Sequence, residues 1–253
     1  MDRGFLLGDG SPAMARDFEE LDYRETRMGE LILRRRRVKA LDDLEVFEVI
    51  LGDAFLMTSM FNAVEIALSE LGLAAHPRSE SLEVVVGGLG LGYTAQAALK
   101  HDSVEVLLVV DALAEVIEWH EKGLVPVGSE LCADERCRLV HGDFFALAGQ
   151  PEVGFDPDRP GRLFDAVLLD VDHTPSKLLD ASHASFYQKA GLQALAAQLR
   201  EDGIFAMWSD DPPDEFFMAS LKEVFTDCRA EEVAFFNPLQ EQEAKSTVYV
   251  ASK

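Results

Sequence analysis

The chain has 253 residues, 48% of them apolar, and a formal net charge of −23 at pH 7. This composition supports a folded core, and the length suits one large α/β domain, alone or with a small appendage. The negative charge disfavours nonspecific nucleic-acid binding, because phosphate repels an acidic surface. The negative charge could attract cationic substrates such as amines, or it could serve only solubility or adaptation to a salty cytoplasm.

Neither membrane insertion nor secretion is expected. No segment approaches the roughly 20 consecutive apolar residues of a membrane helix, and the N-terminal residues lack a basic start followed by an apolar core. The cysteines, Cys132, Cys137 and Cys228, are sparse and do not have the spacing of zinc ligands. We therefore predict a reduced, cytoplasmic protein with no metal site and no membrane or nucleic-acid partner.

The N-terminal quarter predicts a small β-structure. Residues 1–27 are polar and charged, and we expect a loose arm. Two segments rich in Leu, Val, Ile and Phe then predict strands joined by turns, GELILRRRRVKAL (29–41) and LEVFEVILGDAFLMTSM (44–60). We therefore expect a small β-hairpin appendage over residues 28–62. Its basic island, Arg34 to Arg37, could bind an anion, form a charged strand face or contact another subunit.

After the appendage, helix-like and strand-like segments alternate. In chain order we predict helix 62–74, strand 81–88, helix 94–101, strand 104–112, helix 113–123, a strand and turn at 137–147, strand 164–172, helix 184–203 ended by Gly203, strand 204–209, helix 213–225, and strands 231–236 and 246–253. This alternation requires a mostly parallel sheet with helices on both faces. The last two strands follow each other without a helix, so we expect an antiparallel edge hairpin. The predicted fold class is α/β: a doubly wound, mostly parallel, seven-stranded Rossmann-like sheet over residues 63–253, with an antiparallel last strand.

A glycine-rich loop follows the first strand of this sheet, in VVVGGLGLGYT (84–94). Ligands of such sheets bind at the carboxyl ends of the strands, and glycine lets the backbone approach them closely. A helix that begins near Thr94 directs its free N–H groups at the same place. The dinucleotide pattern G-x-G-x-x-G would need glycine at Tyr93, so a dinucleotide is disfavoured. The candidate nucleotide-binding glycines are Gly87, Gly88, Gly90 and Gly92.

Three further strands end in an acid. Asp111 ends the second and can accept both ribose hydroxyls of a nucleoside; the alternative is a helix N-cap. Asp143, preceded by Gly142, follows the third strand and can accept a hydrogen bond from an adenine amino group, or serve only as a turn residue. Asp170 ends the fourth strand at the same rim, where the reactive part of the ligand would project.

Together these motifs resemble the spermidine synthase family, aminopropyltransferases on a class I S-adenosylmethionine-dependent methyltransferase fold. VVVGGLGLG matches the family's glycine motif, RLVHGDFFAL its adenine-side motif and FDAVLLDVD its catalytic strand. The similarity extends from about Gly29 to Lys253. It implies a ribose-binding acid at Asp111, adenine-side contacts at Gly142 and Asp143, and a first catalytic aspartate at Asp170. It also implies association through the appendage, so we expect a homodimer.

The chain diverges from the family in the glycine loop. The family pattern GGGDGG has an aspartate where this chain has Gly90. In the family that acid lies near the ammonium end of decarboxylated S-adenosylmethionine, with which a carboxylate pairs. Intact S-adenosylmethionine also has a tail carboxylate, which an aspartate would repel. Gly90 therefore favours the intact compound.

The acceptor side and the catalytic loop differ as well. Met57 stands where the family has a glutamine, and no Tyr-His-Glu follows it. The family's Asp-Ser-Ser/Thr-Asp reads Asp170-Val171-Asp172-His173, which displaces the second acid by one position. The candidate catalytic residues are Asp170 and Asp172. Asp170 would take a proton from the attacking group or only position that group; the alternative is a loop cap.

Two further side chains near this loop have open roles. His173 could act as a base near neutral pH or face solvent, and Trp208 could wall the acceptor pocket or pack in the core. The favoured function is methyl transfer from S-adenosylmethionine to a small, possibly amine, acceptor. The alternatives are aminopropyl transfer from decarboxylated S-adenosylmethionine, and nucleoside binding without catalysis.

Overall fold

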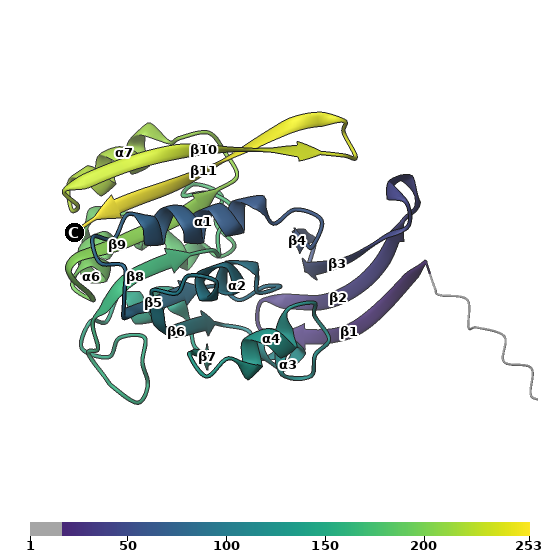
Figure 1. The fold of residues 1–253 in the computed structure, drawn as a ribbon, viewed down its shortest axis with the longest axis horizontal. Helices are drawn as coiled ribbons and strands as arrows, with labels where there is room; N and C mark the ends of the chain where they lie inside the picture. Colours follow the sequence, from purple (N-terminus) through teal and green to yellow (C-terminus); the bar gives the residue numbers. More distant parts are fainter. Residues whose placement is uncertain (1–16) are drawn as a thin grey trace, which may run out of the picture.

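The computed structural model describes residues 17–253, which form a small antiparallel sheet beside a larger α/β unit (Figure 1). The small sheet has the order β1-β2-β3-β4. Its strands are β1 (Phe18–Thr26), β2 (Gly29–Val38), β3 (Leu44–Leu51) and β4 (Ala54–Thr58), with the 3-10 turn η1 (Lys39–Leu41) between β2 and β3. Leu31, Leu33, Val49 and Leu51 alternate along β2 and β3 and are buried in a core shared with the large unit.

The loose arm predicted over residues 1–27 is wrong for the part that the structure describes. Residues 1–16 lie outside the described residues. Phe18–Thr26 form β1, which pairs with β2 from Phe18 opposite Arg36 to Thr26 opposite Gly29. The strand was missed because it is charged, and cross-strand ion pairs such as Arg35 with Glu19 hold it to β2. The appendage is thus a four-stranded sheet, not a hairpin. The proposed domain division at residues 62 and 63 stays a prediction.

The basic island lies on β2 as a charged strand face. Arg34 and Arg36 both bind Glu48 of β3, at 2.6 and 2.7 Å, although the Glu48 side chain is only 2% exposed. Arg35 pairs with Glu19 on β1. These arginines therefore neutralise acids within the sheet, which is the second of the three roles considered for them.

The large unit confirms the predicted α/β class. Its sheet has the order β10-β11-β9-β8-β5-β6-β7, parallel from β9 to β7, with β11 antiparallel to both β9 and β10. The strands are β5 (Leu82–Gly87), β6 (Val104–Asp111), β7 (Cys137–His141), β8 (Phe164–Leu169), β9 (Leu199–Ser209), β10 (Asp227–Asn237) and β11 (Gln242–Ser252). Within residues 17–253, no helix is long and apolar enough to cross a membrane.

Helices cover both faces of this sheet, because successive buried strand residues point to opposite sides. They are α1 (Ala63–Ala74), α2 (Tyr93–Leu99), α3 (Ala114–Glu121), α4 (Gly128–Ala133), α5 (Phe144–Ala148), the 3-10 helix η2 (Ala181–Ser185), α6 (Lys189–Ala196) and α7 (Glu215–Lys222). Val84 and Val86 of β5 pack in one core with α1 to α4, whereas Val85 packs in a second core with α5 to α7.

The bounds predicted for one helix are wrong, and the last two strands each begin four residues earlier than predicted. The helix expected over 184–203 is broken into η2 and the short α6, which ends at Ala196, and β9 begins at Leu199. Leu199 is fully buried and pairs with Phe164 of β8. Asp202 follows with a φ of +62°, so the chain bulges before Ile204 resumes the pairing. Tertiary strand pairing thus overrides the helix propensity of the alanine-rich run.

Candidate active site

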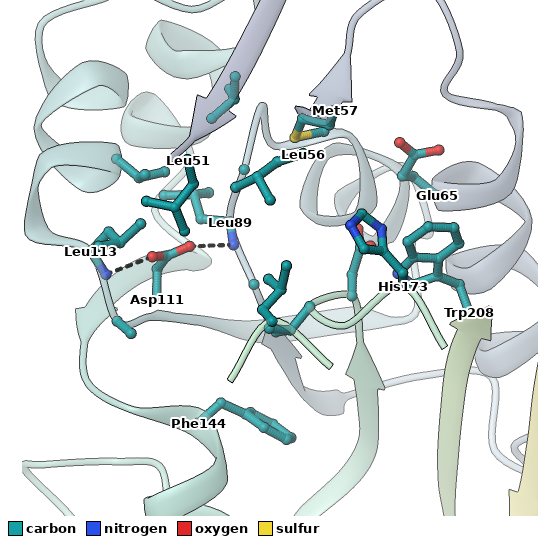
Figure 2. A pocket seen from close by; sticks show the side chains of 18 of the residues that line it. Leu51, Leu56, Met57, Glu65, Leu89, Asp111, Leu113, Phe144, His173 and Trp208 are labelled. Carbon is teal, nitrogen blue, oxygen red and sulfur yellow. Dashed lines mark hydrogen bonds between the residues drawn. The ribbon is translucent and has the colours of Figure 1, made fainter. Parts of the chain in front are cut away.

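A cavity of about 480 Å³ opens at the carboxyl ends of the parallel strands, between the two sheets (Figure 2). β4, α1, the glycine loop and the ends of β6, β8 and β9 line it, and Phe235 of β10 contributes from a hairpin that lies against Phe61. Six carboxylates line this cavity, and no Lys or Arg does, within the described part of the chain. They are Glu65, Asp111, Asp143, Asp170, Asp180 and Asp210.

The glycine loop passes close to the end of β8. Gly88 has a φ of +93°, and a Cβ there would lie 2.0 Å from the Asp170 carbonyl oxygen. Gly90 has a φ of +48°, and a Cβ there would lie 2.4 Å from the sulfur of Met57. The Leu91 N–H donates to that same sulfur at 3.1 Å. Met57 therefore fills the space where a side chain on residue 90 would project.

The predicted ligand-binding residues divide into two groups. Gly88, Gly90, Asp111 and Asp143 line the cavity. The other three, Gly87, Gly92 and Gly142, lie outside its wall. Gly87 packs against Phe144, and Gly92 is the N-cap residue that precedes α2. These outer glycines shape the loops that carry the wall.

Asp111 ties the glycine loop to the start of α3. Its Oδ2 accepts the Leu89 N–H at 2.9 Å and its Oδ1 accepts the Leu113 N–H at 2.8 Å (Figure 2). Burial raises the pKa of Asp111, and these backbone donors partly oppose that effect. The carboxylate therefore orders the loop and also faces the cavity.

Asp143 caps α5. Its Oδ1 accepts from the N–H groups of Phe145 and Ala146, at 2.9 and 3.1 Å, as an N-cap residue does. Among residues 17–253, its Oδ2 has no hydrogen-bond partner. One oxygen is thus structural and the other is open to the cavity.

Asp170 and Glu65 form an acidic pair in the cavity. The Thr94 hydroxyl donates to Oδ2 of Asp170 at 2.5 Å. Burial raises the pKa of Asp170 to about 6, with the Thr94 bond opposing the shift. Burial, followed by the negative charge of Asp170, raises the pKa of Glu65 to about 8. Because no Lys or Arg among residues 17–253 lines the cavity, these two carboxyls share a proton near neutral pH, or bind a cation.

The sequence reasoning missed Glu65. It lies in the first turn of α1, inside a run with ordinary helical periodicity, where the family's Tyr-His-Glu pattern does not occur. The available signal was an acid on the partly apolar face of that run, three residues from the fully buried Leu68. Figure 2 shows its carboxylate directed into the cavity opposite His173 and Trp208.

Asp172, predicted as catalytic, does not line the cavity. It is 2% exposed and accepts hydrogen bonds from the Leu179 N–H at 2.7 Å, the His183 Nδ1 at 2.9 Å and the Tyr187 hydroxyl at 2.7 Å. Its oxygens are occupied by protein donors, so direct contact with a reacting atom is not supported. His183, in contrast, does line the cavity.

His173 and Trp208 are adjacent in the cavity wall. Their ring centroids lie 6.5 Å apart in an edge-to-face arrangement (Figure 2). The Trp208 Nε1 is buried and has no hydrogen-bond partner within residues 17–253. Both side chains therefore lie where they can contact a ligand.

The fold and the site define a class: a Rossmann-like α/β protein with an acid-lined cavity where nucleosides bind in such sheets. Residues 62–233 match the model of the spermine/spermidine synthase domain. The chain belongs to this family.

Known relatives agree with this assignment. The chain is 27% identical over 164 residues to a polyamine aminopropyltransferase of Clostridium tetani, covering 64% of this chain and 52% of that one. It is 25% identical over 240 residues to polyamine aminopropyltransferase 2 of Pseudomonas aeruginosa, covering 87% and 63%. The chain thus spans less than two thirds of each relative. The crystal structure of spermidine synthase from Thermotoga maritima has the same fold, with a TM-score of 0.68, 20% identity and coverage of 92% and 72%.

Proposed function

We propose that the protein is an aminopropyltransferase that moves the aminopropyl group of decarboxylated S-adenosylmethionine to an amine. The observation that carries this proposal is the cavity with six carboxylates and, among the described residues, no lysine or arginine in its wall. A site of this kind attracts cations. The donor has a sulfonium and an ammonium, and the acceptor is itself an amine.

The same observation argues against the methyl transfer that Gly90 led us to expect. Intact S-adenosylmethionine has a tail carboxylate, for which the described residues of the wall offer no guanidinium or ammonium partner, and the ionised Asp170 would repel it. Gly90 does remove one acid from the loop, but Met57 takes its place and Glu65 supplies a carboxylate from α1. The names of the curated relatives support the aminopropyl reaction and not methyl transfer.

In the proposed reaction the acceptor nitrogen attacks the aminopropyl carbon next to the sulfonium. The N–C bond forms, the C–S bond breaks, and the sulfur leaves with the electron pair as the neutral thioether methylthioadenosine. The attacking amine loses one proton, for which the Asp170 carboxylate is the proposed acceptor, because its pKa of about 6 leaves it ionised at neutral pH. Glu65 is the proposed partner of a substrate ammonium, whose positive charge would favour the ionised form of Glu65 and lower its raised pKa.

The nucleoside part of the donor is assigned to the acids at the ends of β6 and β7. Asp111 is proposed for the ribose hydroxyls, since its carboxylate lines the cavity and each carboxylate oxygen can accept more than one hydrogen bond. Asp143 is proposed for the adenine amino group through its unpaired Oδ2.

The test uses the full chain with decarboxylated S-adenosylmethionine and a panel of diamines, with products identified by mass spectrometry. We expect an aminopropylated amine and methylthioadenosine. Parallel reactions contain intact S-adenosylmethionine, and an Asp170→Asn variant should lose about 100-fold or more in kcat. A methylated product from the intact donor, or no product under conditions where the decarboxylated donor binds, would overturn the proposal.

A further inference from the structure

A histidine in the cavity wall has its tautomer set by a buried carboxylate. The His183 Nδ1 lies 2.9 Å from Oδ1 of Asp172. The same oxygen accepts from the Leu179 N–H, and Oδ2 accepts from the Tyr187 hydroxyl. Because Asp172 accepts from each of these groups, Nδ1 must carry the proton that it donates. In the neutral ring, Nε2 then presents a lone pair. Within residues 17–253, Nε2 has no hydrogen-bond partner.

The ring lies on the same side of the cavity as Asp143. His183 is 7% exposed and stacks on Phe145, with ring centroids 3.8 Å apart. The Phe145 N–H is the group that Asp143 caps. His183 and Asp143 line the cavity, whereas Asp172 lies behind the wall. The buried carboxylate therefore acts on the cavity only through the histidine.

Around Asp143 and His183, the nearby hydrogen-bond donors already bond to protein acceptors, so this part of the wall presents acceptors to the cavity. The N–H groups of Phe145 and Ala146 bond to Asp143. The Ser182 hydroxyl, the remaining side-chain donor here, bonds to Asp180 at 2.6 Å. Within residues 17–253, the acceptors that remain open here are Oδ2 of Asp143, Oδ2 of Asp180 and Nε2 of His183. Asp143 and His183 are the two that adjoin Phe145, and two acceptors match the two hydrogens of an exocyclic amino group.

We propose that His183, positioned by Asp172, binds the amino group of a 6-aminopurine and so discriminates against 6-oxopurines. A 6-oxo ligand would bring a carbonyl lone pair against the two acceptors and leave them unpaired, which costs binding free energy. His183 is thus a specificity residue for the nucleoside and Asp172 a positioning residue. The inference rests on the proposed nucleoside donor, but it does not depend on which group is transferred.

The test measures by calorimetry the affinity of the full chain for methylthioadenosine and for methylthioinosine, its 6-oxo counterpart. The parent should bind the 6-amino compound more tightly. In His183→Ala the ratio of the two dissociation constants should fall about 10-fold, through weaker binding of the 6-amino compound. Asp172→Asn should reduce the ratio as well. If His183→Ala does not fold, His183→Gln replaces it. The amide oxygen of the glutamine can accept a hydrogen bond, so His183→Gln should keep more of the selectivity than Asp172→Asn does.

Tyr187→Phe is the matched control, because it removes a different hydrogen bond from the same Asp172 carboxylate. It should leave the ratio unchanged even where it lowers the melting temperature. An unchanged ratio in His183→Ala, or equal losses in His183→Ala and Tyr187→Phe, would overturn the inference and leave the transferase proposal intact. Selective binding without aminopropyl transfer would support this inference and count against that proposal. Failure of the parent to bind either nucleoside would overturn both.

Discussion

The Thr94 hydroxyl, in the first turn of α2, donates a hydrogen bond to the Asp170 carboxylate at the end of β8. It stabilises the ionised form of a side chain whose pKa burial raises to about 6. The same α2 follows the glycine loop, so the backbone element that shapes the nucleoside site also tunes the proposed proton acceptor.

Thr94→Val should therefore shift the pH dependence of the transfer reaction. Without the hydroxyl, the pKa of Asp170 rises, and the ionised fraction falls at every pH near 6. The acidic limb of the kcat profile should move to higher pH by up to about one unit, while activity near pH 9 changes little. Thr94→Ser keeps the donor and should resemble the parent. A limb that stays in place or moves to lower pH would contradict the assignment of Asp170 as proton acceptor.

Glu65 should make the unliganded protein less stable as the pH rises. Its pKa is raised in the folded state, to about 8, so the neutral form is favoured by folding and ionisation opposes it. The stability contribution is present at low pH and is lost as the pH rises through about 8. Between pH 6 and 9, the melting temperature of the parent should fall relative to that of Glu65→Gln, which remains neutral.

The control for Glu65 is Glu70→Gln, an exposed acid on the same helix. It should follow the parent across this pH range in thermal unfolding monitored by circular dichroism. If Glu65→Gln also follows the parent, the carboxyl pair is not energetically coupled in the way described.

Alanine substitutions at Gly88 and at Gly90 should lower the free energy of unfolding by unequal amounts. At Gly88, a Cβ would meet the Asp170 carbonyl oxygen at 2.0 Å with a φ of +93°, and backbone cannot yield easily. We expect Gly88→Ala to lower the free energy of unfolding by about 3 kcal/mol or more. Gly90→Ala should cost less, because its contact is the flexible thioether of Met57.

Urea unfolding measures both effects, and a second substitution tests the cause. Met57→Ala added to Gly90→Ala should recover part of the lost stability, whereas the same change should not help Gly88→Ala. Equal losses at the two glycines would show that the contact with Asp170 is not the determining one.

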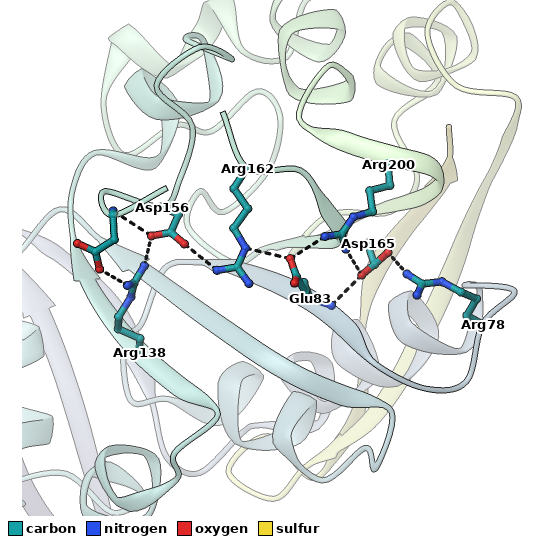
Figure 3. Close-up of polar contacts among 8 residues, drawn as sticks. Arg78, Glu83, Arg138, Asp156, Arg162, Asp165 and Arg200 are labelled. Atoms are coloured by element: carbon teal, nitrogen blue, oxygen red, sulfur yellow. Dashed lines mark hydrogen bonds and ion pairs between the residues drawn. The ribbon is translucent and has the colours of Figure 1, made fainter. Parts of the chain in front are cut away.

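An ion-pair network joins residues at the amino ends of β5, β8 and β9 (Figure 3). None of the residues labelled in that figure lines the cavity. Asp165, which is fully buried, accepts from Arg78, Arg200 and the Glu83 N–H. Burial raises the pKa of Glu83, but the hydrogen bonds and charges of Arg162 and Arg200 outweigh this effect. The net pKa of Glu83 is therefore lowered. The contribution of Glu83 to stability is therefore present near neutral pH and is lost as the pH falls below its unfolded pKa.

Asp165→Asn should destabilise the fold by about 2 kcal/mol, since a fully buried carboxylate then loses its charged hydrogen bonds to the partly exposed Arg78 and Arg200. Transfer activity per folded molecule should not change, because Asp165 is remote from the cavity. Asp158→Asn, which removes a 75% exposed partner of Arg138, should change stability little. A comparable loss in both variants would contradict the importance of burial here.

The homodimer implied by the family resemblance stays a prediction. Light scattering after size-exclusion chromatography at micromolar concentration should give twice the chain mass. A monomeric mass would contradict it.

Much of the site was accessible from local patterns. Alternating strands and helices predicted the sheet, and acids at successive strand ends predicted that Asp111, Asp143 and Asp170 would meet at one rim, as carboxyl ends of parallel strands do. The charged β1 was not predicted, because its partner strand, not its own composition, stabilises it. The end of α6 was misplaced for the same reason, since the pairing of Leu199 with Phe164 is not visible in a window of sequence.

By itself, the sequence determined the α/β class, the glycine loop and the rim of strand-end acids, because each follows from periodicity and residue type over a few positions. Only the tertiary structure decided which acids face the cavity. It brought Glu65 on α1 into the cavity with Asp170, and it placed Asp172 behind the wall, where it contacts the cavity-lining His183. Burial and neighbouring charges set the pKa of a carboxyl group, and both depend on packing between segments that are distant along the chain.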